Sequence, residues 1–142
     1  MISTRPVRYL AGAATLTCVF LLGVHAGRAQ TANRVFEIRT YTSEPGRLPA
    51  LEARFRDHTV AIFQRHGMTS IGYWVPQDSP RSQDTLIYIL AHPSREAAKA
   101  DWAAFNSDPE WQKVRAESEA NGKIVNHVDS VFMTPADFSA LK

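Results

Sequence analysis

The sequence predicts an α+β fold in which a four-stranded antiparallel sheet carries helices on one face only. Six segments follow residue 33 in the order strand, helix, strand, strand, helix, strand. The strand segments alternate apolar and polar residues or are nearly all apolar, whereas the helical segments repeat apolar residues every three or four positions. In this order all helices pack on the same face of the sheet, so the other face needs a different cover.

A change of period separates the first strand from the first helix. Residues 35–41 alternate between apolar and polar types, which predicts a half-buried strand. Pro45 and Gly46 then supply a turn. Leucine, isoleucine and phenylalanine recur at helical spacing over residues 47–66 and predict one long amphipathic helix, which Gly67 ends.

The two middle strands are predicted from their β-branched and aromatic residues. Residues 69–75 form the second strand. A polar loop with two prolines follows over residues 76–83. Residues 85–92 are nearly all apolar, which suits a central position in the sheet.

The last part of the domain is predicted as two helical pieces and a strand. The helical pieces cover residues 95–106 and 109–120, and the strand covers residues 124–133. The domain therefore spans residues 34–133. Residues 134–142 form a short tail, in which Phe138 is expected to pack against the domain.

Residues 1–29 have the layout of a secretory signal peptide. A positive start is followed by an uncharged apolar run over residues 9–24, with a cleavage site expected after Ala29 or, as second choice, after Ala26. The alternative is an uncleaved anchor, although about sixteen apolar residues fall short of the roughly twenty that a bilayer requires. The expected product is exported, periplasmic or secreted, and has no membrane contact after cleavage.

The chain that remains after cleavage would have neither cysteine nor a basic surface. Cys18, the only cysteine, lies inside the apolar run, so the remainder has no disulfide and no thiolate. Removing Arg5, Arg8 and Arg28 leaves 13 of the 16 basic residues against all 14 acidic ones, a net charge of about −1. Such a chain has no basic stripe, which argues against nucleic acid as a partner.

Three motifs together resemble the NIPSNAP family of the dimeric α+β barrel superfamily. They are residues 35–42 with Pro45-Gly46, residues 65–68 with Gly72-Tyr73-Trp74, and Trp102 and Phe105 with residues 108–111. The resemblance implies a ferredoxin-like protomer and a homodimer that pairs two sheets into an α/β barrel. It implies no settled catalytic residues, and neighbouring families include cofactor-independent monooxygenases, haem-degrading enzymes, isomerases and dehydratases.

Strand alternation sorts the side chains between the two faces of the sheet. We expect the more apolar set to face the helices, namely Phe36, Ile38, Ile87, Ile89, Ala91, Val128 and Phe132. The bare face then receives Glu37, Arg39, Tyr41, Leu86, Tyr88, Leu90, His92, His127, Asp129 and Val131. The second strand adds either Tyr73 or Trp74.

That mixed face is too apolar for an open surface and too charged for a dry core. A partly wet cavity inside a dimer satisfies both limits, and ligand sites have this composition. The predicted ligand-binding residues are Glu37, Arg39, Tyr41, Trp74, Tyr88, His92, His127 and Asp129. No metal is expected, because the spacing of His92, His127 and Asp129 does not resemble a compact metal motif, and no cofactor is implied.

Four residues are candidates for catalysis: Arg39, Tyr41, His58 and Tyr88. Arg39 can hold a carboxylate or enolate oxygen, or it can form a structural ion pair with Glu37. The two tyrosines can donate to a substrate oxygen or simply line the face. His58 is a candidate general base because its ordinary pKa lies near neutrality.

Three functions remain open at this point. The first is a homodimer that binds a small apolar or aromatic metabolite, and the second is a cofactor-independent monooxygenase or isomerase. The third is a protein-interaction module that presents an exposed apolar helix face. Nucleophilic hydrolysis, nucleotide use and zinc proteolysis are disfavoured because the chain lacks their motifs.

Overall fold

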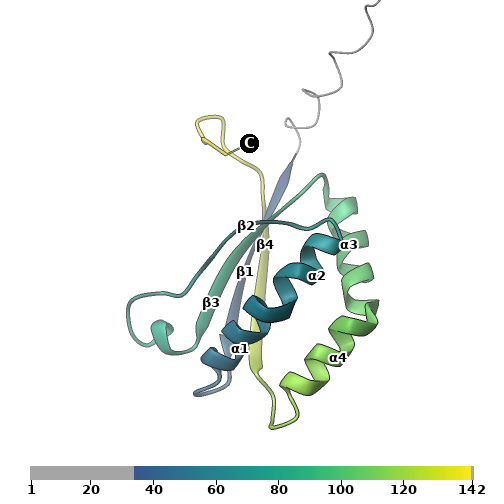
Figure 1. Cartoon of the computed structure of the whole chain (residues 1–142). Coiled ribbons are helices and arrows are strands. Elements are labelled where there is room, and N and C mark those ends of the chain that lie inside the picture. The colour runs from purple at the N-terminus through teal and green to yellow at the C-terminus, as the bar shows by residue number, and fades with distance from the viewer. Residues whose placement is uncertain (1–33, 142) are drawn as a thin grey trace, which may run out of the picture.

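A four-stranded antiparallel sheet forms the body of the protein, with its strands in the order β2-β3-β1-β4. The computed structural model describes residues 34–141, so the predicted signal peptide lies outside the described residues. The strands are β1 (Val35–Ser43), β2 (Thr69–Trp74), β3 (Thr85–His92) and β4 (Val125–Met133). The helices cover one face of the sheet (Figure 1), which confirms the predicted α+β, ferredoxin-like architecture.

The first helical segment is continuous but not uniform. It consists of α1 (Leu48–Arg54), a π-helical turn (Phe55–Thr59) and α2 (Val60–Arg65), where a single helix was predicted. Within the π-helical turn, the buried Thr59 hydroxyl donates to the carbonyl of Arg54 at 3.1 Å. Hydrophobic periodicity does not reveal such a turn, because the apolar face continues through it.

The second helical segment consists of α3 (Arg95–Ser107) and α4 (Pro109–Ser118), which are separated only by Asp108. Ser94 caps α3, since its hydroxyl accepts a hydrogen bond from the Ala97 amide at 3.1 Å. A short 3₁₀ turn (Arg81–Gln83) lies in the loop between β2 and β3. Among residues 34–141, no helix is long and apolar enough to cross a membrane.

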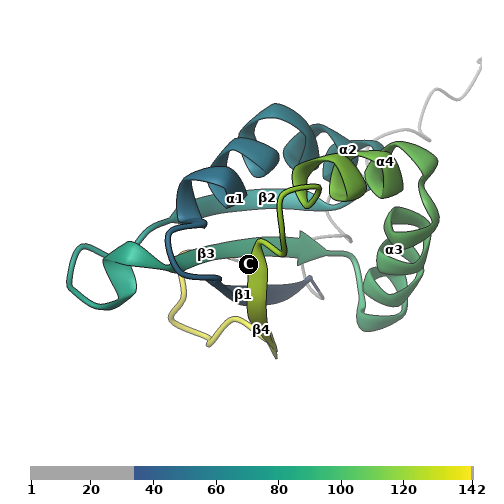
Figure 2. The same cartoon turned by 90° about the horizontal axis from the view of Figure 1, so that it is seen from below.

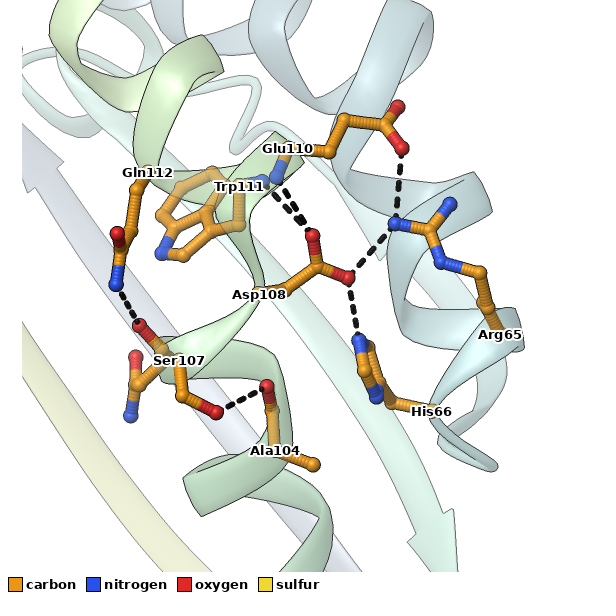
Figure 3. A network of polar contacts seen from close by, with 9 residues as sticks. Arg65, His66, Ala104, Ser107, Asp108, Glu110, Trp111 and Gln112 are labelled. Atoms are coloured by element: carbon orange, nitrogen blue, oxygen red, sulfur yellow. Dashed lines mark hydrogen bonds and ion pairs between the residues drawn. The ribbon is translucent and has the colours of Figure 1, made fainter.

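Asp108 connects the two helical segments. One carboxylate oxygen accepts from the amides of Glu110 (2.7 Å) and Trp111 (3.3 Å), which caps α4. The other oxygen meets Arg65 at 2.8 Å and His66 at 2.6 Å, at the end of α2 (Figure 3).

The predicted orientation of β1 and β3 is wrong. Glu37, Arg39 and Tyr41 face the helices, because Glu37 accepts a hydrogen bond from Trp102 on α3 and Tyr41 packs against Phe55. Residues that pair directly across antiparallel strands share a face. Leu86, Tyr88, Leu90 and His92 are therefore on the helix side as well. Phe36, Ile38, Ile87, Ile89 and Ala91 lie on the opposite face.

The orientation of β4 was predicted correctly. Phe132 pairs with Glu37 and Val128 pairs with Tyr41, which places both on the helix side. His127, Asp129 and Val131 lie on the opposite face. Alternation along a strand reveals which residues share a face, but not which face meets the helices. Because β1 and β3 carry apolar residues on both faces, their composition does not show which face is the buried one.

An aromatic core fills the space between the sheet and the helices. Tyr88, which is fully buried, packs against Phe55, Phe63 and Tyr73 with ring centroids 5.1 to 5.9 Å apart. We call the face without helices the open face. It carries the apolar residues of β1 and β3 that were expected to face the helices. Trp74 lies there opposite Ile87, which settles the choice between Tyr73 and Trp74.

The open face stays partly uncovered in the single chain. Trp74 is 49% exposed and Val131 is 57% exposed. The C-terminal tail runs on the side of the sheet away from the helices (Figure 2). Phe138 is 90% exposed, so its predicted packing against the domain is wrong.

Candidate ligand-binding groove

Glu37 is the centre of a buried polar cluster between the sheet and α3. Its side chain is 1% exposed, yet four groups surround the carboxylate. One oxygen accepts from Arg39 at 2.8 Å and from the Ser130 hydroxyl at 2.6 Å. The other accepts from the Trp102 indole at 2.7 Å and lies 3.3 Å from Nε2 of His92. These contacts satisfy a charge that would otherwise be costly to bury.

The surroundings hold Glu37 in its ionised form. Burial alone raises the pKa of this carboxyl, but the adjacent His92 ring and the hydrogen bonds from Ser130, Trp102 and Arg39 outweigh it and lower the pKa to about 2. A carboxylate with so low a pKa is a weak proton acceptor at neutral pH. Glu37 is therefore suited to orienting its neighbours rather than to acting as a general base.

Arg39 forms the charged floor of a groove. Its guanidinium lies over the Trp102 ring at 4.2 Å and near the Tyr41 ring at 5.7 Å. One guanidinium nitrogen is paired with Glu37. Nε of Arg39 is buried and has no acceptor among the residues that the structure describes. A buried donor without a partner is rare in proteins.

The groove runs between α3 and β4 and has a volume of about 640 Å³. Its lining combines charged and aromatic groups: Glu37, Arg39, Arg95, Glu96, Lys99, Trp102, Ser130 and Phe132. Arg95, Lys99 and Trp102 follow one another at intervals of four and three residues, which places them on one side of α3. The Arg95 guanidinium crosses to β4 and lies over the Phe132 ring at 3.8 Å.

The two tyrosines predicted as donors lie deeper than the groove. The Tyr88 hydroxyl donates to that of Tyr41 at 3.2 Å. Burial raises the pKa of Tyr88 well above its ordinary value, so its hydroxyl stays protonated. Both rings belong to the aromatic core, and neither lines the groove.

The predicted histidines do not come together. His92 is fully buried on the helix side, with Nδ1 3.6 Å from a carboxylate oxygen of Asp101. His127 pairs with Asp129 at 3.1 Å on the opposite, exposed side of the sheet. Within residues 34–141, no group of three or more histidine, cysteine or acidic side chains is arranged to hold a metal ion.

His58 lies apart from the Glu37 cluster. It is exposed on the π-helical turn and lines a second, smaller groove of about 360 Å³ against α4, beside Arg54 and Asp57. Trp74 lies on the open face, away from both grooves. The structure therefore brings Glu37, Arg39 and His92 together and leaves His58, Trp74, His127 and Asp129 elsewhere.

Six lining residues were not predicted from the sequence: Arg95, Glu96, Lys99, Trp102, Ser130 and Phe132. Trp102 entered the sequence analysis only as part of a family motif. The spacing of positions 95, 99 and 102 was a usable signal, because it predicts one charged and aromatic side of a helix. Ser130 could not be recognised, since only the register of β1 against β4 places it beside Glu37.

Comparison with solved structures identifies proteins of the same fold. A NIPSNAP-like domain protein from Burkholderia xenovorans is 19% identical, with a TM-score of 0.66, and the match covers 78% of this chain and 92% of that one. A NIPSNAP family protein from Agrobacterium tumefaciens is 21% identical, with a TM-score of 0.68 and coverage of 78% and 100%. At these identities the likeness establishes the fold alone.

A more distant match is SnoaB, a cofactor-independent oxygenase from Streptomyces nogalater, at 13% identity and a TM-score of 0.51. The match covers 77% of this chain and 99% of that one. A search of curated proteins gave no match. The sequence model of the NIPSNAP family, however, matches residues 36–140, which is most of the chain. This protein therefore belongs to the NIPSNAP family.

Proposed function

We propose that this protein binds a small apolar or aromatic metabolite in the Glu37 groove. The supporting observation is the buried Glu37–Arg39–Trp102–Ser130 cluster at the floor of an open groove of about 640 Å³. Such a volume suits a small ligand, and a few fixed polar groups beside aromatic walls are typical of ligand sites. The site lies within one protomer, between the sheet and α3, rather than on the open face.

Binding without catalysis fits the chemistry of the groove better than the enzymatic alternative. A cofactor-independent monooxygenase or isomerase needs a group that removes a proton from its substrate. Glu37 is a weak base because of its low pKa, and His92 is fully buried behind it. The fold likeness to SnoaB does not supply a base, because one scaffold hosts many chemistries.

We also propose that two protomers pair through the open face. Ile38, Ile87, Ile89, Trp74 and Val131 form an apolar strand surface without helices. Apolar surfaces of this kind are usually covered in soluble proteins. The large exposed apolar residues of the described chain lie on the open face or in the tail, not on a helix, which argues against the interaction-module hypothesis.

Export remains part of the proposal. The layout of residues 1–29 predicts a cleaved signal peptide and a periplasmic or secreted protein. Sequencing of the amino terminus of protein recovered from its host should give Gln30 or Gly27. A start at Met1 would indicate an uncleaved anchor instead.

Ligand binding can be tested with two neighbouring residues of β4 that face opposite ways. Phe132→Ala removes the aromatic wall of the groove, and Val131→Ala, its matched control, shortens a side chain on the open face. We expect calorimetry to detect binding of 2-naphthoate or 2-naphthamide to the unaltered protein. Phe132→Ala should weaken that binding about tenfold, because burying a ring contributes at least 1.4 kcal/mol.

The result for Val131→Ala decides where the site lies. Unchanged affinity in this variant, together with the loss in Phe132→Ala, supports the groove. Equal losses of affinity in both variants would mean that the ligand does not bind in the groove. Absence of binding for both probes would contradict the proposed function itself.

A further inference from the structure

The charges that line the groove are not balanced by the chain itself. Arg39 is neutralised by Glu37, which leaves Arg95, Lys99 and Glu96 at the rim. Within residues 34–141, neither Arg95 nor Lys99 forms an ion pair with a carboxylate. The rim therefore has an excess of positive charge facing the groove.

Glu96 does not offset both cations, because it is directed to its own helix end. It lies in the first turn of α3, and the pKa of Glu96 is lowered by its own backbone amide, by the Ser94 hydroxyl and by the charge of the adjacent Arg95. A carboxylate in the first turn interacts favourably with the helix dipole. Glu96 thus interacts with its own helix end and with Arg95, whereas the exposed Lys99 forms no ion pair with a carboxylate among residues 34–141.

At the floor of the groove, the guanidinium of Arg39 also has a group without a partner. Nε of Arg39 is a buried donor without a partner in the described chain, although the other side of this guanidinium is held by Glu37. A ligand oxygen would satisfy it. Lys99 at the rim has no carboxylate partner among the described residues and favours a negatively charged ligand. The free donor at the floor is an independent observation and calls for an oxygen acceptor.

We propose that the natural ligand of the groove is an aromatic carboxylate. Its ring would lie along Phe132 and the planar guanidinium of Arg95, and its carboxylate would pair with Lys99 and with the free donor of Arg39. This inference rests on the proposed function, which requires only a small apolar or aromatic ligand. It adds that the ligand is an anion and names Lys99 as a residue that determines specificity.

The test compares two probes of nearly equal shape, 2-naphthoate and its neutral amide, 2-naphthamide. Calorimetry on the unaltered protein should give about tenfold tighter binding for the carboxylate, because charge-assisted hydrogen bonds are roughly twice as strong as neutral ones. Lys99→Gln should weaken 2-naphthoate about fivefold and leave 2-naphthamide unchanged, since an exposed ion pair contributes modestly.

Lys113→Gln is the matched control, because Lys113 is an exposed lysine of α4 outside the groove and the variant makes the same change in net charge. A loss of 2-naphthoate affinity confined to Lys99→Gln supports the inference. Equal affinity for the two probes would overturn it while leaving ligand binding in place. If neither probe binds, both this inference and the proposed function fail.

Discussion

At the scale of single residues, the ionised Glu37 is the least expected feature of the core. A buried carboxylate costs stability unless its oxygens are fully hydrogen-bonded. Here Arg39, Ser130 and Trp102 provide these bonds from β1, β4 and α3. One charged residue therefore ties together three elements that are distant in the sequence.

The pH dependence of stability follows from the pKa of Glu37, which falls from 4.5 to about 2 on folding. A lowered pKa stabilises the folded state above pH 4.5, and the contribution is lost as the pH falls from 4.5 towards 2. A pKa shift of this size corresponds to about 3 kcal/mol in the free energy of unfolding. Urea unfolding at a series of pH values should show this decline.

Glu37→Gln isolates the contribution of this carboxylate. The variant should be less stable at pH 7 by about 3 kcal/mol, because breaking a buried ion pair is strongly destabilising. Its stability should also change less than that of the unaltered protein between pH 5 and about pH 2. Parallel curves for the two proteins would mean that Glu37 is not the group responsible.

The residue scale also defines what the sequence could predict about the site. Glu37, Arg39 and Tyr41 were correctly placed on one face, because alternation along a strand requires it. The orientation of this face was predicted wrongly. Phe36 and Ile38 are apolar, so they were expected to face the helices in place of Glu37, Arg39 and Tyr41. The hydrogen bond from Trp102 to Glu37 decides the matter, and it depends on tertiary packing.

At the scale of elements, most boundaries were predicted from local chemistry. β3 has the predicted limits, and α3 extends one residue beyond its prediction. Turn residues and caps act locally, so they are readable in sequence. The π-helical turn at residues 55–59 was not predicted, because its amphipathic pattern is that of an ordinary helix.

Asp108 connects two elements, and two substitutions separate its roles. Asn can keep the cap on α4 but loses the charge that meets Arg65 and His66. Ala loses both. We expect Asp108→Ala to lower Tm by about 5 °C and Asp108→Asn to lower it less, as measured by thermal unfolding. Equal losses would assign the effect to the charge rather than to the cap.

At the scale of the whole molecule, the open face is the surface through which we propose that two protomers pair. Its apolar residues are arranged on a strand surface that the helices do not cover. We expect light scattering to give twice the mass of one chain. Val131→Asp should shift the protein to the monomer, because an unpaired charge in an apolar interface is costly.

Ala103→Asp is the control for this experiment, since it adds the same charge to an exposed position of α3. It should leave the dimer intact. A monomeric unaltered protein would contradict the pairing of open faces, and a Val131→Asp dimer would place the interface elsewhere. Neither result would bear on the groove, which lies within one protomer.

If ligands bind on the helix side of the sheet, the indole signals of two tryptophans will distinguish this side from the open face. Trp102 lines the groove, whereas Trp74 lies on the open face. In an NMR titration with 2-naphthoate, we expect the Trp102 indole resonance to shift and the Trp74 resonance to stay in place. A shift of Trp74 alone would contradict binding on the helix side.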